Sequence, residues 1–300
     1  MQLAEIKKSL CSVVAIPVTP YDDNGALDFD VYRNIVSHMV DSGISVITPN
    51  GNTGEFYALS PQECRQAVEA AVSGADNKAL VLAGVGFDTS TAIEMATFAE
   101  EAGAGAVMIH QPVHPFRSPQ GWVAYHRTIA DACPNLGIVP YIRDTIVDTS
   151  MLRELANNCP NFVGIKYAVS NPLPFTEIVR RVGADRLAWI CGLAEGWAPF
   201  FWVGGAQGFT SGLVNVKPDY SLKMLSCLET GDQAGAMEIW SKIKPFEDLR
   251  ARRQNANNVP AVKEAMAQIG LCNRSVRPPI SELPDEEKTE VASILATWSP

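Results

Sequence analysis

Eight short apolar runs recur along the first 215 residues of this chain, and amphipathic stretches lie between them. This alternation indicates parallel strands joined by helices. The predicted strands span residues 12–18, 45–49, 79–83, 106–109, 137–141, 162–166, 187–191 and 208–211. The predicted helices span residues 30–42, 60–73, 90–102, 120–132, 150–157, 174–182 and 195–203. Eight such units predict an α/β fold, a (β/α)8 TIM barrel.

The remainder of the chain contains no further strand-like run. We expect helices at residues 220–229, 233–249, 260–269 and 286–298. We therefore predict a catalytic barrel domain over residues 1–218 and a helical domain over residues 219–300 that packs on the barrel or on a neighbouring subunit. A doubly wound open sheet is the structural alternative, but it usually has a glycine-rich phosphate motif after its first strand. Residues 15–20 read Ala-Ile-Pro-Val-Thr-Pro and do not resemble one.

Composition excludes several classes of partner. Three hundred residues with 47% hydrophobic content can bury a large core, and the net charge of −9 is spread without a basic stripe, so no nucleic-acid partner is expected. No segment reaches transmembrane length, and residues 1–10 read as mature sequence rather than a signal peptide. Seven cysteines stand singly, which favours reduced thiols. We expect a cytoplasmic protein with no membrane partner.

Lys166 ends the sixth predicted strand, where the run Phe162-Val163-Gly164-Ile165 leads directly into it. The carboxyl ends of barrel strands carry catalytic groups. In apolar surroundings the ammonium form is disfavoured, so a neutral amine that attacks carbonyls becomes accessible near neutral pH. This predicts Schiff-base chemistry. The alternative is a lysine that extends its charged end into solvent.

The second predicted strand leads into a loop with two glycines and two small polar residues at positions 51–54. Backbone N–H groups at Gly51, Asn52 and Thr53 are candidates to bind a substrate carboxylate. Alternatively, this is an ordinary turn in which Thr53 caps the next helix.

Two further candidates are the last residue of the fifth predicted strand and a residue just after it. Tyr141 can move protons between substrate and Lys166, and Arg143 can bind a distal carboxylate. The alternatives are a half-buried strand tyrosine and an arginine paired with Asp144 or with another neighbouring residue. We also assign Gly192 and Thr210, at the seventh and eighth predicted strands, to the substrate-binding set.

The four histidines raise a metal-dependent alternative. His110 and His114 follow the fourth predicted strand, while His38 and His126 lie in predicted helices. No HxH or HExxH spacing is present, so a three-ligand site would need additional carboxylates. We predict no metal and no other cofactor.

Three motifs in order, residues 51–56 (Gly-Asn-Thr-Gly-Glu-Phe), Tyr141 and residues 164–166 (Gly-Ile-Lys), resemble the dihydrodipicolinate synthase and N-acetylneuraminate lyase family of class I aldolases. The resemblance spans about residues 9–295. It implies an imine between Lys166 and a pyruvate-like 2-oxo acid, carboxylate binding at Asn52 and Thr53, and proton relay through Tyr141. It also implies a homotetramer, a dimer of dimers.

The chain departs from the synthase branch of that family. Asn52 replaces a threonine whose hydroxyl belongs to the relay, Val113-His114 replaces a tyrosine pair, and the arginine that binds aspartate semialdehyde would fall near Ile146. The segments 54–57, 141–144, 244–246 and 276–279 are instead similar to the 5-dehydro-4-deoxyglucarate dehydratase branch. Asn52 and the residues after Lys166 differ from that branch as well.

These observations lead to one main hypothesis and two alternatives. The main hypothesis is a lyase that acts on a 2-oxo deoxy sugar acid through a Lys166 imine, by dehydration or retro-aldol cleavage. One alternative is a synthase that condenses pyruvate with aspartate semialdehyde. The other is a catalytically silent barrel that binds a keto acid.

Overall fold

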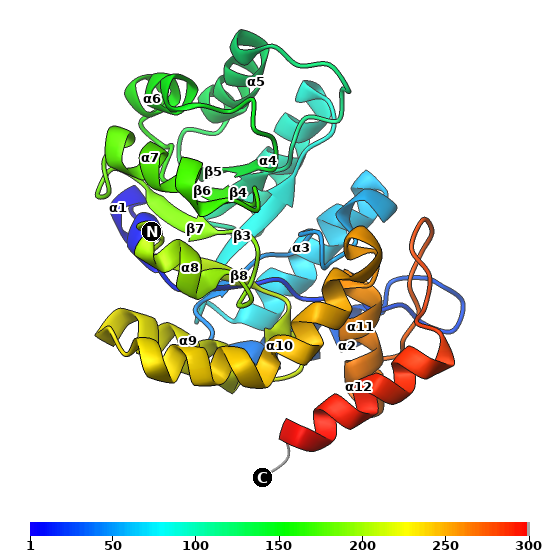
Figure 1. The fold of residues 1–300 in the computed structure, drawn as a ribbon. Coiled ribbons are helices and arrows are strands. Elements are labelled where there is room, and N and C mark those ends of the chain that lie inside the picture. The colour runs from blue at the N-terminus through cyan, green and yellow to red at the C-terminus, as the bar shows by residue number, and fades with distance from the viewer. Residues whose placement is uncertain (299–300) are drawn as a thin grey trace.

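Eight parallel strands close into a barrel in the computed structural model, which describes residues 1–298 (Figure 1). Each strand pairs with the next, and β8 pairs with β1 to complete the ring. The predicted (β/α)8 barrel is therefore confirmed, and the open-sheet alternative is wrong. The strands are β1 (Val13–Ala15), β2 (Val46–Ile47), β3 (Leu80–Val85), β4 (Ala106–Ile109), β5 (Gly137–Ile142), β6 (Gly164–Tyr167), β7 (Ala188–Cys191) and β8 (Gly208–Ser211).

Helices follow the strands at the predicted places. They are α2 (Phe29–Asp41), α3 (Pro61–Ala75), α4 (Thr89–Ala102), α5 (Pro119–Ala132), α6 (Thr149–Asn158), α7 (Pro172–Val182) and α8 (Ala198–Val203). Local sequence explains where most of them begin, because a side-chain oxygen accepts a hydrogen bond from a first-turn backbone N–H. The capping residues are Asp28, Ser60, Asp88, Ser118, Asp148 and Asn171. The seventh predicted helix begins later than expected, at Ala198 rather than residue 195.

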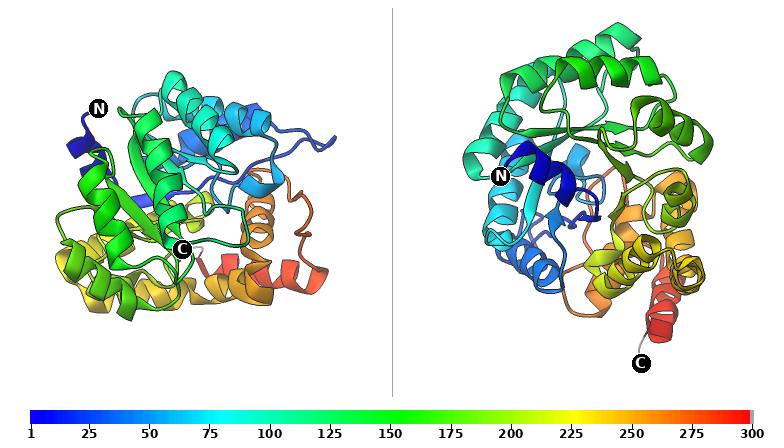
Figure 2. Two further views of the ribbon diagram at one scale, coloured as in Figure 1. Left: turned by 90° about the horizontal axis from the view of Figure 1, so that it is seen from above. Right: turned by 90° about the vertical axis from the view of Figure 1, so that its left-hand side faces the viewer.

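Side chains alternate between the inside of the barrel and the surrounding helices. The interior cluster contains Val14, Val46, Met108, Val139 and Ile190, among others. A short helix that the sequence analysis did not predict, α1 (Leu3–Ser9), lies across the amino-terminal end of the barrel (Figure 2). Its Ile6 and the following Leu10 join the interior cluster. Because α1 lies across the amino-terminal end, we expect the functional site at the opposite, carboxyl end of the barrel.

Four helices follow the barrel, as predicted: α9 (Pro218–Thr230), α10 (Gln233–Asn255), α11 (Asn258–Gln268) and α12 (Asp285–Trp298). They pack on the barrel rather than standing apart (Figure 1): α9 contacts β1, α10 contacts α8, and α11 contacts the 3-10 turn η2 (Leu213–Asn215). The last residues of α10, from Arg252 to Gln254, leave helical geometry, and this bend leads the chain into α11. The division into two domains at residue 218 stays a prediction.

Within residues 1–298, no helix combines the length and the apolar character needed to cross a membrane. The seven cysteines are all unpaired, as their spacing predicts.

Candidate active site

A cavity of about 900 Å³ opens at the carboxyl ends of the strands. Seven of the eight residues assigned to the site from sequence line this cavity: Asn52, Thr53, Tyr141, Arg143, Lys166, Gly192 and Thr210. The eighth, Gly51, is buried behind the wall, where a Cβ atom would lie 2.5 Å from the Cγ2 atom of Ile16. Gly51 therefore allows the loop to approach β1 closely, and its side of the loop does not reach the cavity.

Lys166 lies inside the barrel mouth with only 3% of its surface exposed. Its Nζ atom lies 4.2 Å from the centroid of the Tyr141 ring. Burial, and secondarily the nearby Arg143 guanidinium, lowers the pKa of the amine to about 7. A substantial share of the amine is then neutral and nucleophilic at neutral pH. The alternative of a side chain extended into solvent does not describe this residue.

Gly192 leaves room for the Lys166 side chain. A Cβ atom at this position would lie 2.9 Å from the Cγ atom of Lys166 and 3.0 Å from the Tyr167 carbonyl oxygen. Real Cβ atoms do not approach so closely, so a larger residue would displace the Lys166 stem. Gly192 thus positions the amine.

Tyr141 lies directly opposite Lys166 in the pairing of β5 with β6. The two side chains therefore point into the barrel at the same level. Tyr141 is 4% exposed, and its hydroxyl oxygen accepts a hydrogen bond from Asn52 Nδ2 at 3.1 Å. Burial raises the pKa of the phenol to about 12, while Arg143 and Asn52 act in the opposite direction. A buried phenol beside a neutral amine is suited to proton transfer at a bound substrate.

Arg143 lies at the rim of the cavity, with its guanidinium carbon 5.9 Å from the Tyr141 ring centroid. The alternative that it pairs with Asp144 is wrong, because Asp144 pairs with Arg117 instead. Within residues 1–298, Arg143 forms no ion pair with an acidic side chain. Its charge is available to an anionic ligand in the cavity.

The loop that carries Asn52 and Thr53 is held from both sides. The residues that flank it, Asn50 and Glu55, both have left-handed backbone conformations, with φ of 60° and 58°. His110 Nε2 donates to the Asn50 carbonyl oxygen at 2.7 Å, and Lys263 Nζ donates to Glu55 Oε1 at 2.6 Å. Such conformations persist when the surroundings enforce them, and they are frequent at functional sites.

Thr53 is buried at 3% exposure and does not cap a helix. Ser60 caps α3, with its hydroxyl accepting from the backbone N–H of Glu63. The helix-cap alternative for Thr53 is therefore wrong.

Sequence reasoning missed part of the cavity wall, which comes from the C-terminal helices. Arg250 on α10 is 5% exposed; it donates to Glu247 Oε1 at 2.6 Å and to Asn258 Oδ1 at 2.7 Å. No local motif marks these residues, because their relation to the barrel arises only from the packing of α10 and α11. The full contribution of this region to the lining is Trp240, Lys244, Glu247, Asp248, Arg250, Ala251, Asn255 and Asn258.

Glu195 is a second residue that the sequence analysis did not single out. It is fully buried in the segment between β7 and α8, and its Oε1 accepts a hydrogen bond from the Ser221 hydroxyl at 2.5 Å. Burial first, and then the charge of Glu247, raises the pKa of its carboxyl to about 7. Glu195 itself does not line the cavity, although its neighbours Ala194 and Gly196 do.

The four histidines do not converge. His110 and His126 bond to backbone carbonyl oxygens, and His114 bonds within its own loop at Phe116. In the part of the chain from 1 to 298, no three side chains of metal-binding type gather at one point. The metal-dependent alternative therefore has no ligand set among these residues.

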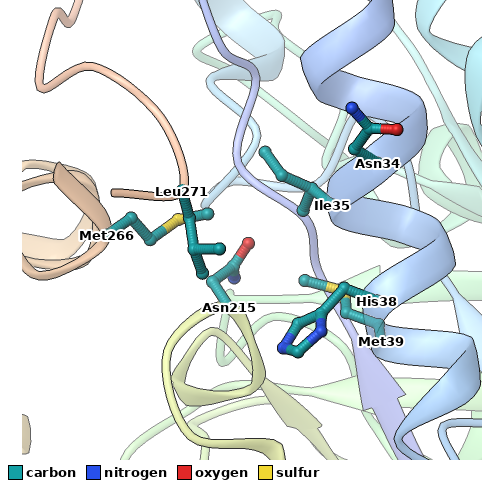
Figure 3. A pocket seen from close by; sticks show the side chains of 7 residues that line it. All are labelled: Asn34, Ile35, His38, Met39, Asn215, Met266 and Leu271. Atoms are coloured by element: carbon teal, nitrogen blue, oxygen red, sulfur yellow. The ribbon is translucent and has the colours of Figure 1, made fainter. Parts of the chain in front are cut away.

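His38 lies elsewhere, beside a small hollow of about 60 Å³ between α2, η2 and the end of α11 (Figure 3). The hollow is lined mainly by apolar side chains, including Ile35, Met39 and Met266. It is too small and too apolar to hold the polar substrate that the main cavity suits.

Residues 9–298 match the model of the dihydrodipicolinate synthetase family. The chain belongs to this family. This membership, together with the dehydratase names of its relatives, indicates a lyase, so the predicted enzyme class is confirmed.

Relatives of known description fall into two groups. A probable 5-dehydro-4-deoxyglucarate dehydratase from Rhizobium rhizogenes is 31% identical over 99% of both chains. A probable 5-dehydro-4-deoxyglucarate dehydratase from Rhodococcus opacus is 33% identical over 94% of this chain and 93% of the relative. Among solved structures, a dihydrodipicolinate synthase from Bacillus clausii is 43% identical, with a TM-score of 0.94 over 98% of this chain and 99% of that one. Another from Oceanobacillus iheyensis is 39% identical, with a TM-score of 0.95 over 99% of both.

Proposed function

We propose that this protein is a Schiff-base-forming lyase that dehydrates or cleaves a 2-oxo deoxy sugar acid bearing a second anionic end. The observation that carries the proposal is the buried Lys166 amine, whose pKa is lowered to about 7 and which lies 4.2 Å from the Tyr141 ring. The names of the dehydratase relatives favour 5-dehydro-4-deoxyglucarate or a related compound.

The site residues divide the work as follows. The Lys166 amine attacks the C2 carbonyl, and loss of water gives a protonated imine that withdraws electrons from C3. Tyr141 takes the C3 proton and supplies one to the leaving group. Backbone N–H groups at Asn52 and Thr53 hold the C1 carboxylate, and Arg143 binds the distal carboxylate. The covalent imine makes a separate cofactor unnecessary.

A second candidate is the condensation of pyruvate with aspartate semialdehyde. The identities of 43% and 39% to structures described as dihydrodipicolinate synthases favour it. Both reactions use the same imine with a 2-oxo acid. They differ in the next step, because the enamine either expels a leaving group or attacks the aldehyde of the second substrate.

Steady-state turnover on a small substrate panel tests the proposal. The panel contains 5-dehydro-4-deoxyglucarate, the corresponding acid with an uncharged distal end, and pyruvate with aspartate semialdehyde. We expect the dicarboxylate to give the highest kcat/KM. Arg143→Met should lower that value by roughly 10- to 100-fold, because a charge-assisted hydrogen bond contributes about 1.5–3 kcal/mol.

The uncharged analogue is the matched control, since Arg143→Met should change its kcat/KM little. Faster turnover of pyruvate with aspartate semialdehyde would establish the synthase instead. Imine formation without any product would indicate that the protein binds the keto acid but does not catalyse its conversion.

A further inference from the structure

The hydrogen bond between Asn52 and Tyr141 has a defined direction. The Asn52 Nδ2 group donates and the phenol oxygen accepts, at 3.1 Å. A carboxamide N–H stabilises a phenolate but does not titrate, so it cannot carry a proton away. Asn52 therefore supports the charged form of Tyr141 without extending a proton path.

The other groups that face Tyr141 do not extend the path either. Lys166 on β6 and Arg143 after β5 approach the ring, and the His110 ring centroid lies 5.8 Å away. His110 is held by the Asn50 carbonyl, and burial lowers its pKa to about 3. Tyr57 raises the pKa of Tyr141 only through its charge and forms no hydrogen bond with the phenol. Within residues 1–298, Asn52 is the one side chain hydrogen-bonded to the Tyr141 hydroxyl.

The hydrogen-bonded path from Tyr141 does not continue beyond Asn52. Its Oδ1 atom is buried and has no hydrogen-bond partner among the described residues. Tyr141 itself is only 4% exposed. A substrate in the cavity would cover the remaining surface, which leaves the phenol as an isolated proton carrier.

We propose that Asn52 is a positioning residue that ends the proton path at Tyr141, so that this phenol keeps the proton it removes from the substrate and returns it within the same turnover. The inference rests on the proposed imine mechanism and deepens it. It predicts that protons at C3 of a bound 2-oxo acid exchange slowly with solvent.

The dehydration balances with this one carrier. The Tyr141 O–H protonates the hydroxyl that leaves C2 as water when the imine forms, which gives an iminium and a phenolate. The phenolate takes a proton from C3, and the C–H electron pair forms the enamine. The enamine then expels the C4 oxygen, the Tyr141 proton goes to it, and a second water leaves. Hydrolysis of the imine returns a proton to the phenolate and frees Lys166.

Exchange of the pyruvate methyl hydrogens in D2O tests the inference, because pyruvate forms the imine and enamine but has no leaving group at C4. NMR measures deuterium entry into the methyl group, and borohydride trapping measures the rate of imine formation. In the wild-type protein we expect exchange to be roughly tenfold or more slower than imine formation. Asn52→Thr places a hydroxyl that both accepts and donates beside Tyr141, so the ratio of exchange to trapping should rise by roughly tenfold.

Two further variants separate proton transfer from a general disturbance of the site. Ser170→Ala removes a hydroxyl that lines the cavity without bonding to Tyr141, and it should leave the ratio at the wild-type value. Asn52→Ala removes the donor to the phenolate, so the alkaline midpoint of the exchange rate should move to higher pH while the ratio stays low.

The outcomes distinguish this inference from the proposed function. Absence of any adduct on Lys166 would overturn both. An adduct on Lys166 together with methyl exchange as fast as trapping, unchanged in Asn52→Thr, would overturn the isolated carrier and leave the imine mechanism standing.

Discussion

At the scale of single residues, Lys166 is the nucleophile of the proposed mechanism, and its protonation state should set the pH dependence. Its pKa in the folded protein is about 7, and the nucleophilic form is the neutral amine. Below about pH 7 the neutral fraction falls tenfold per pH unit. We expect the second-order rate of borohydride trapping with pyruvate to fall by about tenfold from pH 6.5 to 5.5 and to level off above pH 8. A rate that stays flat across pH 5.5–8 would contradict a lysine pKa near 7.

The residues of the site differ in how readily the sequence reveals them. Lys166 and Tyr141 were predictable because each occupies an inward position at the end of a strand, where polar groups have a functional reason to occur. Arg250 was not predicted, because its place in the cavity wall depends on the packing of α10 beside Gly212, a residue distant in sequence. Gly51 packs against Ile16 and does not line the cavity, and its predicted backbone contact with a carboxylate stays a prediction.

At the scale of elements, a buried ion pair joins the β2–α3 loop to α11. Lys263 and Glu55 have side chains 0% and 1% exposed, with Nζ 2.6 Å from Oε1. Glu55 Oε2 also accepts from the Arg277 backbone N–H at 2.9 Å. The pair therefore fixes the end of the loop that carries Asn52 and Thr53.

Breaking this pair should be costly. Lys263→Met leaves the Glu55 carboxylate buried without its partner, which typically costs about 3–5 kcal/mol of unfolding free energy. Urea unfolding at pH 7 measures the loss, and the KM for pyruvate should rise because the loop loses its anchor. The double variant Lys263→Met with Glu55→Gln should recover a large part of the stability. Equal destabilisation in the single and double variants would show that the charge pairing is not the cause.

Most barrel helices were predictable as elements because an N-capping residue precedes an amphipathic pattern, as Ser60 does for α3. The helix α1 was missed because seven residues of alternating charge and apolar character give too short a pattern. The bend at Arg252 has no sequence signal either, since no glycine or proline marks it.

At the scale of the whole molecule, the C-terminal helices complete both the core and the cavity. Ile243, Phe246 and Leu249 of α10 are fully buried, and Arg250 lines the cavity beside them. The barrel would therefore expose a large apolar surface without these helices. The sequence indicated their presence but not their contribution to the site.

Truncation tests this dependence. We expect residues 1–218 alone to unfold without a cooperative transition and to form no borohydride-trapped adduct with pyruvate. Circular dichroism during thermal unfolding checks the first expectation, and mass spectrometry checks the second. A truncated barrel that unfolds cooperatively and still forms the adduct would show that the two parts are independent.

For the full chain, we expect light scattering to report a homotetramer.

Mass spectrometry of the borohydride-reduced protein after incubation with pyruvate tests the central claim most directly. We predict one adduct per chain, mapped to the peptide that contains Lys166 and absent in Lys166→Ala. Lys244, which lines the same cavity and pairs with Asp248, provides the matched control, so Lys244→Ala should keep the adduct. An adduct that persists in Lys166→Ala, or that maps to another lysine, would contradict the proposed mechanism.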